Sequence, residues 1–248
     1  MKRVVIGSTL DRSILAIAAA LVFGTLTLSA TTAGANSFDD KPKILLHLKA
    51  LTTKNQCTTW GNLTDCKEAV TKGLLAAPTT GPFYFMYMLV ANGNLRGSDI
   101  GGQDLGIAGV QMGVQYNGAA NAGVDVFTWN LCATLEFSST GWPASGGGNL
   151  ITWDSTNKCQ QGDVSIAGYF YCGAYTADNF AITTRPVDGA AKVADCSSNE
   201  IPLTPGDLGF ASFSTDGGAN SCNPCIASCT TPVEATTWSK IKGSYTGR

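Results

Sequence analysis

Three cysteines near the end of the chain have the spacing of a metal or redox site. They lie in the segment Cys222-Asn-Pro-Cys225-Ile-Ala-Ser-Cys229. Structural zinc sites take four ligands, and the only histidine of the chain, His47, lies far away in the sequence. A redox Cys-x-x-Cys pair works at the start of a helix, and the polar residues that follow do not predict one. We therefore favour disulfides here over a metal or redox site, and we expect no cofactor.

Few residues elsewhere in the chain are candidates for catalysis. With His47 as the single histidine and no Gly-x-Ser-x-Gly elbow, a Ser-His-Asp triad is not indicated. Glu136 and Asp154 both end predicted strands and are the candidates for the paired carboxylates of a glycoside hydrolase. Asp99 and Asp104 could supply oxygen ligands to calcium, but their spacing fits no standard loop and favours a solvated turn.

Aromatic residues suggest a binding role instead. Trp142 lies in a Gly-Trp-Pro turn followed by three glycines, and it is our first candidate for a contact residue, with Trp153 and Tyr169 next. Exposed rings of this kind stack on sugars or dock partners, but rings in strands more often belong to the core. We expect at least three of the following six rings to be buried: Trp129, Trp142, Trp153, Tyr169, Phe170 and Tyr171.

The first residues have the pattern of a secretory signal peptide. Lys2 and Arg3 precede a charge-free apolar run that is shorter than the roughly 20 residues of a membrane span. Ala33-Gly34-Ala35 then provides small residues for cleavage after Ala35. The sequence therefore predicts an exported protein that is secreted, extracellular or at a bacterial cell surface. It predicts no membrane span after cleavage.

Export places the nine cysteines in an oxidising compartment, where disulfides form. An odd number leaves one thiol free or bonded to another chain. Connectivity does not follow from sequence, and the spacing favours three pairs: Cys57 with Cys66, Cys132 with Cys159, and Cys172 with Cys196.

Composition favours β structure, because glycine is abundant and charged residues make up 14% of the chain. One short helix is predicted over residues 65–75, with Asp65 as N-cap and Glu68 in the capping-box position. Alternating or aromatic-rich segments predict strands over residues 43–49, 83–91, 106–116, 124–137 (a pair or one bent strand), 150–153, 166–174, 179–184 and 208–214. We expect an all-β fold, an antiparallel two-sheet sandwich of about eight or nine strands, with a closed barrel as the competitor.

We divide the chain into four parts. These are a signal peptide (1–35), a β-sandwich domain (36–221), a Cys-rich linker (222–233) and a C-terminal tail helix (234–248). In the tail, Trp238, Ile241 and Tyr245 recur at helical spacing. The tail either packs back on the sandwich or is recognised by a sorting or attachment system.

Three segments carry a resemblance to known proteins. Gly106-Ile-Ala-Gly-Val-Gln-Met-Gly-Val-Gln-Tyr116, the Trp142-Pro143 loop up to Trp153, and Trp238-Ser-Lys-Ile-Lys242 resemble a group of uncharacterised exported proteins from uncultured bacteria, over most of the mature chain. That group brings no known activity. The Gly-Val-Gln strand is also similar to cohesin-like and other adhesion-type β modules, although no residues match their calcium or dockerin contacts.

These observations predict a secreted or cell-surface binding or structural module without catalytic activity. Its partner would be a cell-surface protein or a polysaccharide, through adhesion or through carbohydrate or protein binding. The few, scattered cations and the net charge of −2 argue against nucleic acid. The alternative is a secreted carbohydrate-active hydrolase that uses paired carboxylates.

Overall fold

The computed structural model describes residues 41–51, 57–58, 61, 63–76, 82–93, 106–217 and 220–230. The predicted signal peptide, Asp99 and Asp104, and the predicted tail helix with Trp238, Ile241 and Tyr245 lie outside these residues. The regular secondary structure of the described residues is almost entirely β-strand. The strands run as follows: β1 Lys43–Ala50, β2 Lys72–Leu74, β3 Tyr84–Ala91, β4 Ile107–Gln115, β5 Val124–Leu131, β6 Leu135–Ser138, β7 Gly148–Thr152, β8 Val164–Ala174, β9 Asp178–Thr183, β10 Lys192–Asp195, β11 Glu200–Pro202 and β12 Phe210–Ser214.

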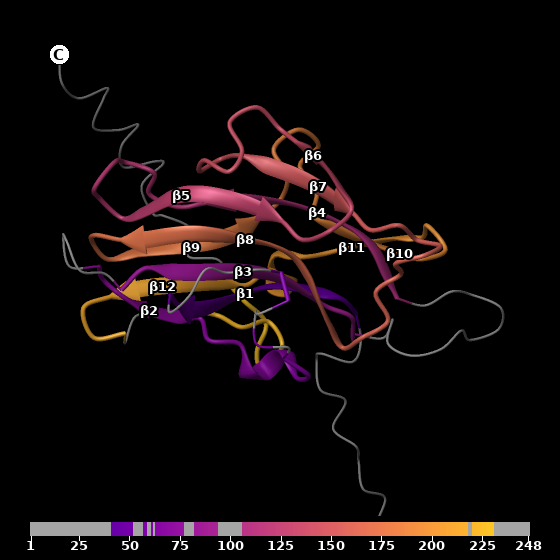
Figure 1. The fold of residues 1–248 in the computed structure, drawn as a ribbon, viewed down its shortest axis with the longest axis horizontal. Helices are drawn as coiled ribbons and strands as arrows, with labels where there is room; N and C mark the ends of the chain where they lie inside the picture. Colours follow the sequence, from indigo (N-terminus) through magenta and orange to yellow (C-terminus); the bar gives the residue numbers. More distant parts are fainter. Residues whose placement is uncertain are drawn as a thin grey trace, which may run out of the picture. The chain divides into compact units, whose positions relative to one another are not determined.

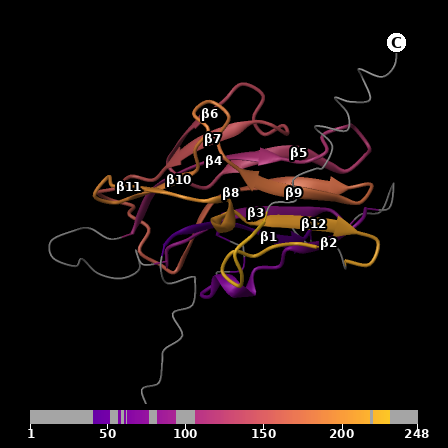
Figure 2. The ribbon, with the colours of Figure 1, turned by 180° about the vertical axis from the view of Figure 1, so that it is seen from behind.

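The strands form two sheets (Figure 1, and from behind in Figure 2). Sheet A has the order β1-β3-β8-β5, and every pair in it is antiparallel. Sheet B follows the order β11-β10-β4-β9-β12-β2, with β7 and then β6 added beside β4. The only parallel pair among the named strands of the described residues is β12 with β2.

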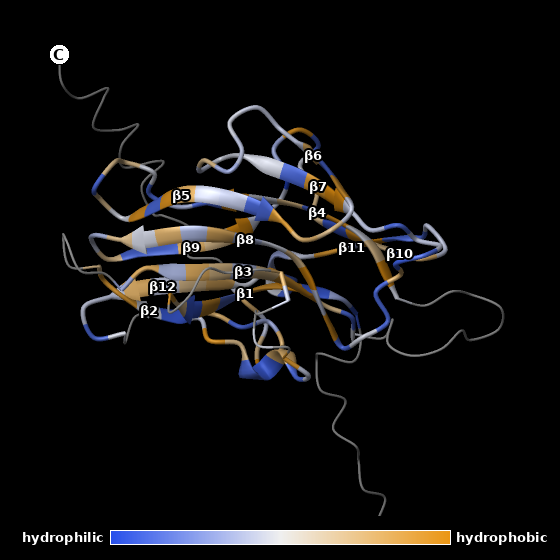
Figure 3. Cartoon of the chain, viewed as in Figure 1, coloured by the Kyte–Doolittle hydropathy of each residue, from blue (hydrophilic) through white to orange (hydrophobic). Residues whose placement is uncertain are grey.

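The core lies between the inner faces of the two sheets. β3 contributes Met86, Met88 and Val90 from sheet A, and β4 contributes Met112 and Val114 from sheet B. Because side chains alternate along a strand, each strand with one buried stripe places its other stripe on the outer face of its sheet. Figure 3 shows the mainly hydrophobic colouring of the strands in the middle of the stack. The described residues therefore form a β-sandwich and no closed barrel.

A second, smaller apolar cluster covers part of the outer face of sheet A. Leu45, Tyr87 and Leu89 point away from the main core and pack under Cys66 and Cys225. The strand β1 is thus buried on both faces. Two loop segments, from residues 63–69 and 222–229, cover this part of the sheet, and the Cys66–Cys225 disulfide joins them to each other.

The predicted helix over residues 65–75 is wrong. Asp65 does act as N-cap, since its Oδ1 accepts a hydrogen bond of 2.9 Å from the Lys67 N–H. However, the helix is a single 3-10 turn, η1, that ends at Glu68, and β2 follows. Contacts with β1 explain why the helix does not continue. The Val70 N–H donates to His47 Nδ1, and the Val70 carbonyl accepts from the Leu48 N–H, so these two hydrogen bonds hold the chain in an extended conformation.

Candidate binding groove

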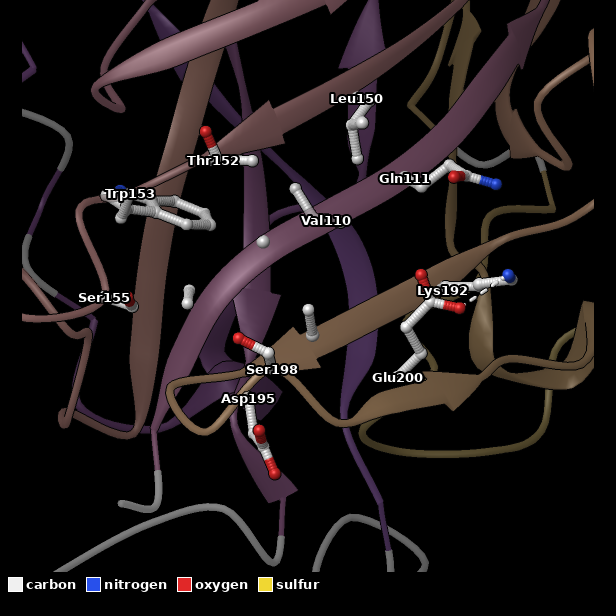
Figure 4. Close-up of a pocket in the computed structure, with 13 residues that line it drawn as sticks. Val110, Gln111, Leu150, Thr152, Trp153, Ser155, Lys192, Asp195, Ser198 and Glu200 are labelled. Atoms are coloured by element: carbon white, nitrogen blue, oxygen red, sulfur yellow. Dashed lines mark hydrogen bonds and ion pairs between the residues drawn. The ribbon is translucent and has the colours of Figure 1, made fainter.

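A groove of about 340 Å³ crosses the outer face of sheet B (Figure 4). The strand β4 runs along its floor, with Trp153 and Ser155 on one side and Lys192 and Glu200 on the other. We call it the β4 groove. It is lined by Ala108, Gly109, Val110, Gln111, Leu150, Thr152, Trp153, Ser155, Lys192, Ala194, Asp195, Ser198 and Glu200.

Strand register explains which side chains meet in the groove. Directly opposed residues of antiparallel strands place their side chains on the same face. Two rows therefore cross the outer face of sheet B. One consists of Phe137, Leu150, Gln111, Lys192 and Pro202, and the other of Leu135, Thr152, Gly109, Ala194 and Glu200.

The floor of the groove is low because its central residue has no side chain. A Cβ on Gly109 would lie 3.4 Å from the Ala194 Cβ, 3.6 Å from the Ile151 carbonyl and 3.8 Å from the Thr152 Cγ2. These are ordinary contacts, so the packing of the sheet does not demand a glycine here. The absence of a side chain at Gly109 therefore leaves open space above β4, and a larger residue would fill it.

One wall of the groove is charged. The Lys192 ammonium donates to the Glu200 carboxylate at 2.7 Å, and this hydrogen bond raises the pKa of Lys192. Between this wall and the floor, the buried Gln111 amide donates to the Ala190 carbonyl at 3.2 Å. The wall thus offers both signs of charge side by side, with the glutamate 62% exposed.

The other acid in the groove is fully occupied by its own turn. Asp195 Oδ1 accepts hydrogen bonds from the Ser197 and Asn199 N–H groups at 2.9 and 2.7 Å. Its Oδ2 accepts from the Asn199 amide at 2.8 Å. Asp195 therefore shapes the β10–β11 turn, and neither acid of the groove is placed as a free proton donor or nucleophile.

Apolar side chains continue the same face beyond the groove. Leu135 and Phe137 lie on β6, which pairs only with β7, and they are 50% and 54% exposed. Leu150 connects them to the groove, since it is paired with both Phe137 and Gln111. The outer face of sheet B is therefore apolar at the β6 end and charged at the β11 end.

The three predicted contact residues do not lie together. Trp153 lines the β4 groove but is only 6% exposed. Trp142, expected on an exposed loop, is half-buried and packs against Trp129 and Phe170, with ring centroids 5.2 and 5.6 Å apart. Tyr169 lies on the outer face of sheet A, in the cluster under Cys66 and Cys225.

The expectation that at least three of six aromatic rings are buried is confirmed. Phe170 is fully buried, and Trp153 and Tyr169 are 6% and 9% exposed. Gly109, Gln111 and Glu200 were not singled out from the sequence. A signal for the first two is present there, because one face of the 106–116 strand consists mostly of small or polar residues.

The structure gives the candidate hydrolase acids separate structural tasks. Glu136 Oε2 accepts hydrogen bonds from the Trp129 indole at 2.8 Å and the Asn149 amide at 2.7 Å. Asp154 caps the turn after β7, and hydrogen bonds from the Asn157 side chain and backbone lower its pKa. A general acid needs the opposite shift. Neither residue lines the β4 groove.

The cysteines pair in a way that differs from the favoured connectivity. The disulfides are Cys57–Cys132, Cys66–Cys225, Cys159–Cys196 and Cys222–Cys229. The pairs Cys57–Cys66, Cys132–Cys159 and Cys172–Cys196 are therefore wrong. Sequence neighbours were favoured, but the sandwich brings distant loops onto the same outer face. The odd thiol is Cys172, and its burial on the inner face of β8 raises its pKa to about 12.

His47 is a buried strand residue, in agreement with its predicted place in an alternating strand. Burial is the main cause that lowers its pKa from 6.5 to about 4, and Lys49 adds to the effect. Its Nδ1 accepts the Val70 N–H at 3.0 Å, so the ring is used to hold β1 against the segment before β2.

Within the described ranges, no group of three or more His, Cys, Asp or Glu side chains is arranged to hold a metal ion. The same ranges contain no helix with the length and apolar character of a membrane span. Four disulfides in one sandwich are typical of extracellular proteins.

Fold and groove together define a disulfide-linked β-sandwich with an open groove on one outer face. The chain matches no protein-family model and no curated protein. Among solved structures it is similar to a cohesin module of a family 33 glycoside hydrolase from Clostridium perfringens, with 8% identity over 70% of this chain and 97% of that one, at a TM-score of 0.40.

Two cohesins from Acetivibrio cellulolyticus are also similar. For a type II cohesin domain of its cellulosome, identity is 10% over 71% of this chain and 96% of that one, at a TM-score of 0.38. For the sixth cohesin of scaffoldin B, solved with a Cel5 dockerin, identity is 8% over 69% and 98%, also at 0.38. The weak similarity to cohesin-like β modules expected from the sequence is thus confirmed. It carries no information about the partner of this chain.

Proposed function

We propose that this protein is an exported, non-catalytic binding module that holds a protein partner on the outer face of sheet B. The observation that carries the proposal is the β4 groove, whose floor is open at Gly109 and whose walls are apolar on one side and charged on the other. Protein interfaces combine these features, since apolar side chains supply burial and charged ones supply orientation.

The exposed residues of β6 support a protein partner. Leu135 and Phe137 continue the groove wall that Leu150 begins, and contiguous exposed apolar side chains mark interaction sites. The state of the acids speaks against hydrolysis. Asp195 is held by its own turn, Glu200 by Lys192, and Glu136 and Asp154 by neighbours elsewhere.

The proposal is tested with a substitution that fills the groove. Gly109→Leu places an isobutyl group on the groove floor at a position where a Cβ fits, so we expect folding to persist and binding to be lost. Asn130→Leu adds the same side chain to the exposed β5 strand of sheet A and is the matched control. Immobilised variants are exposed to the cell-envelope fraction of the producing organism, with and without prior protease digestion.

The expected result is capture by the wild-type chain and Asn130→Leu, loss with Gly109→Leu, and loss after protease treatment of the fraction. Equal capture by Gly109→Leu would show that the groove is not the binding face. Capture that survives protease digestion would contradict a protein partner.

Export belongs to the same proposal. We propose that residues 1–35 are removed on secretion, that residues 36–221 form the domain, and that the Cys-rich linker 222–233 and the tail 234–248 follow it. Intact mass measurement of the non-reduced protein from culture medium or cell surface should give a chain that begins at Asn36. A chain that retains residues 1–35 inside cells, with all thiols reduced, would overturn export.

A further inference from the structure

A second concave site lies beside the edge strand β5 of sheet A, between this strand, the segment after β4 and the β6–β7 loop. Its volume is about 350 Å³, and we call it the β5 hollow. The residues that matter for its chemistry are Tyr116, Asp125, Phe127, Gly141, Pro143 and Ala144. None of them lines the β4 groove.

The walls of the β5 hollow are held in place by hydrogen bonds. The Tyr116 hydroxyl donates to the Pro143 carbonyl at 3.0 Å, and the Tyr116 N–H donates to Ser145 Oγ at 2.9 Å. Asp178 Oδ2 accepts from the Asn117 and Val124 N–H groups, both at 3.0 Å, and so fixes the loop that precedes β5. The hollow is therefore formed before any ligand arrives.

A β-bulge presents an aromatic ring at the hollow. Val126 pairs with Cys172 and Thr128 with Tyr171, so Phe127 has no partner of its own on β8. Bulges re-aim side chains next to functional sites. Phe127 is 43% exposed, and its ring packs against Tyr171 and Phe83, with ring centroids 5.0 and 5.7 Å away.

A carboxylate lies two residues from this ring. Asp125 is half-buried, and its Oδ2 accepts one hydrogen bond, of 3.2 Å, from the Asn121 N–H. Its remaining lone pairs can accept from hydroxyl groups of a ligand. Among the described residues that line the hollow, none is Lys or Arg. The site therefore disfavours polyanions and suits a neutral ligand rich in hydroxyl donors.

We infer that the β5 hollow binds a neutral polysaccharide, with Phe127 as the platform under a sugar ring and Asp125 as the acceptor for its hydroxyl groups. A pyranose presents an apolar C–H face and a rim of hydroxyls, which match an aromatic ring beside a carboxylate. This site shares no lining residue with the β4 groove, so the chain would hold a polymer at one site and a protein at the other.

The test is affinity gel electrophoresis of the mature chain in gels that contain hydroxyethylcellulose, xyloglucan or polygalacturonate. We expect the two neutral polymers to retard the wild-type chain and polygalacturonate to have no effect. Phe127→Ala and Asp125→Asn should each weaken retardation by about tenfold in affinity, the loss of one stacking or hydrogen-bonding contact. Val187→Ala, at an exposed apolar residue in the turn between β9 and β10 that lines neither site, is the matched control and should behave as wild type.

Phe127→Trp separates binding from folding. It retains a stacking ring, so retardation should persist, and its indole fluorescence should change when xyloglucan is added. Unchanged retardation of Phe127→Ala, retardation by polygalacturonate alone, or no retardation by either neutral polymer would each overturn the inference. None of these results bears on protein capture by the β4 groove, which Gly109→Leu tests separately.

Discussion

His47 shows how one side chain connects strand position to solution behaviour. Its ring lies on the outer face of β1, near Tyr87, with Nδ1 already accepting a backbone N–H. A proton on Nδ1 would remove that hydrogen bond and place a charge in an apolar cluster, which is why the pKa lies at about 4 in the folded chain.

The sign of the resulting pH dependence follows from linkage. The unfolded chain binds a proton on His47 at pKa 6.5 and the folded chain at about 4. Stability is therefore fully present above pH 6.5 and falls as the pH drops towards 4, by at most about 1.4 kcal/mol per pH unit. Urea unfolding at several pH values measures this slope, and His47→Gln should flatten it. If His47→Gln leaves the pH dependence of stability unchanged, other titratable groups cause that dependence.

Asp207 also makes the stability of the fold depend on pH in the acid range. Its carboxylate accepts from Thr204 Oγ1 and the Lys41 ammonium, both at 2.6 Å, and its pKa is lowered although its burial acts in the opposite direction. Because the folded state holds this group charged, its contribution is present above the usual pKa of 3.8 and is lost below it. On acidification, His47 therefore begins to lower the stability of the fold at a higher pH than Asp207 does.

At the scale of elements, two glycines, one in each sheet, have opposite roles. A Cβ on Gly168 of β8 would lie 2.3 Å from the Trp129 ring and 2.6 Å from the Asn130 carbonyl. Gly168 therefore lets β5 and its tryptophan approach β8. A Cβ on Gly109, in contrast, meets only ordinary contacts.

We expect Gly168→Ala to lower the free energy of unfolding by about 1–3 kcal/mol, the cost of overpacking a well-filled site. Gly109→Ala should stay within about 0.5 kcal/mol of wild type. Chemical denaturation of both variants measures the difference. A loss at Gly109→Ala as large as at Gly168→Ala would mean that the groove floor is packed and that there is no open space above Gly109.

Strands with clear alternation could be predicted from the sequence, and those formed by distant pairing could not. The apolar positions of β4 predict its inner face, and Tyr84–Ala91 reads as a strand because it is continuously apolar. β2, β10 and β11 are three or four residues long and carry little pattern of their own. β2 exists because β12, far along the chain, pairs with it in parallel.

The candidate sites show the same division. Trp153 and the small face of β4 are visible in the sequence, whereas the wall formed by Lys192 and Glu200 requires the β10–β11 turn to place them beside β4. Phe127 reads as an ordinary strand residue, because the bulge that exposes it depends on its pairing with β8.

At the scale of the whole molecule, the disulfides determine which loops are fixed to the sandwich. Cys66–Cys225 closes a separation of 159 residues and Cys222–Cys229 one of 7. Because loop-closure entropy grows with the logarithm of loop length, the long bridge should stabilise more than the short one.

We predict that Cys66→Ser with Cys225→Ser lowers the free energy of unfolding by about 2–5 kcal/mol. Cys222→Ser with Cys229→Ser, the matched control, should lower it less. Thermal and urea unfolding under non-reducing conditions measure both. If both double variants lose the same free energy of unfolding, the Cys66–Cys225 bridge stabilises the fold through local packing and not through the length of the loop that it closes.

The Cys66–Cys225 bridge also determines how tension travels through the molecule. A pull applied to the chain beyond Thr230 first reaches the ring closed by Cys222–Cys229, and from Cys225 within this ring the second disulfide passes part of the load to the 63–69 segment on sheet A. Only part of the load then acts on β12, because the rest enters sheet A through the Cys66–Cys225 bridge. A chain tethered through its end would therefore resist unravelling from that end better than one without this bridge.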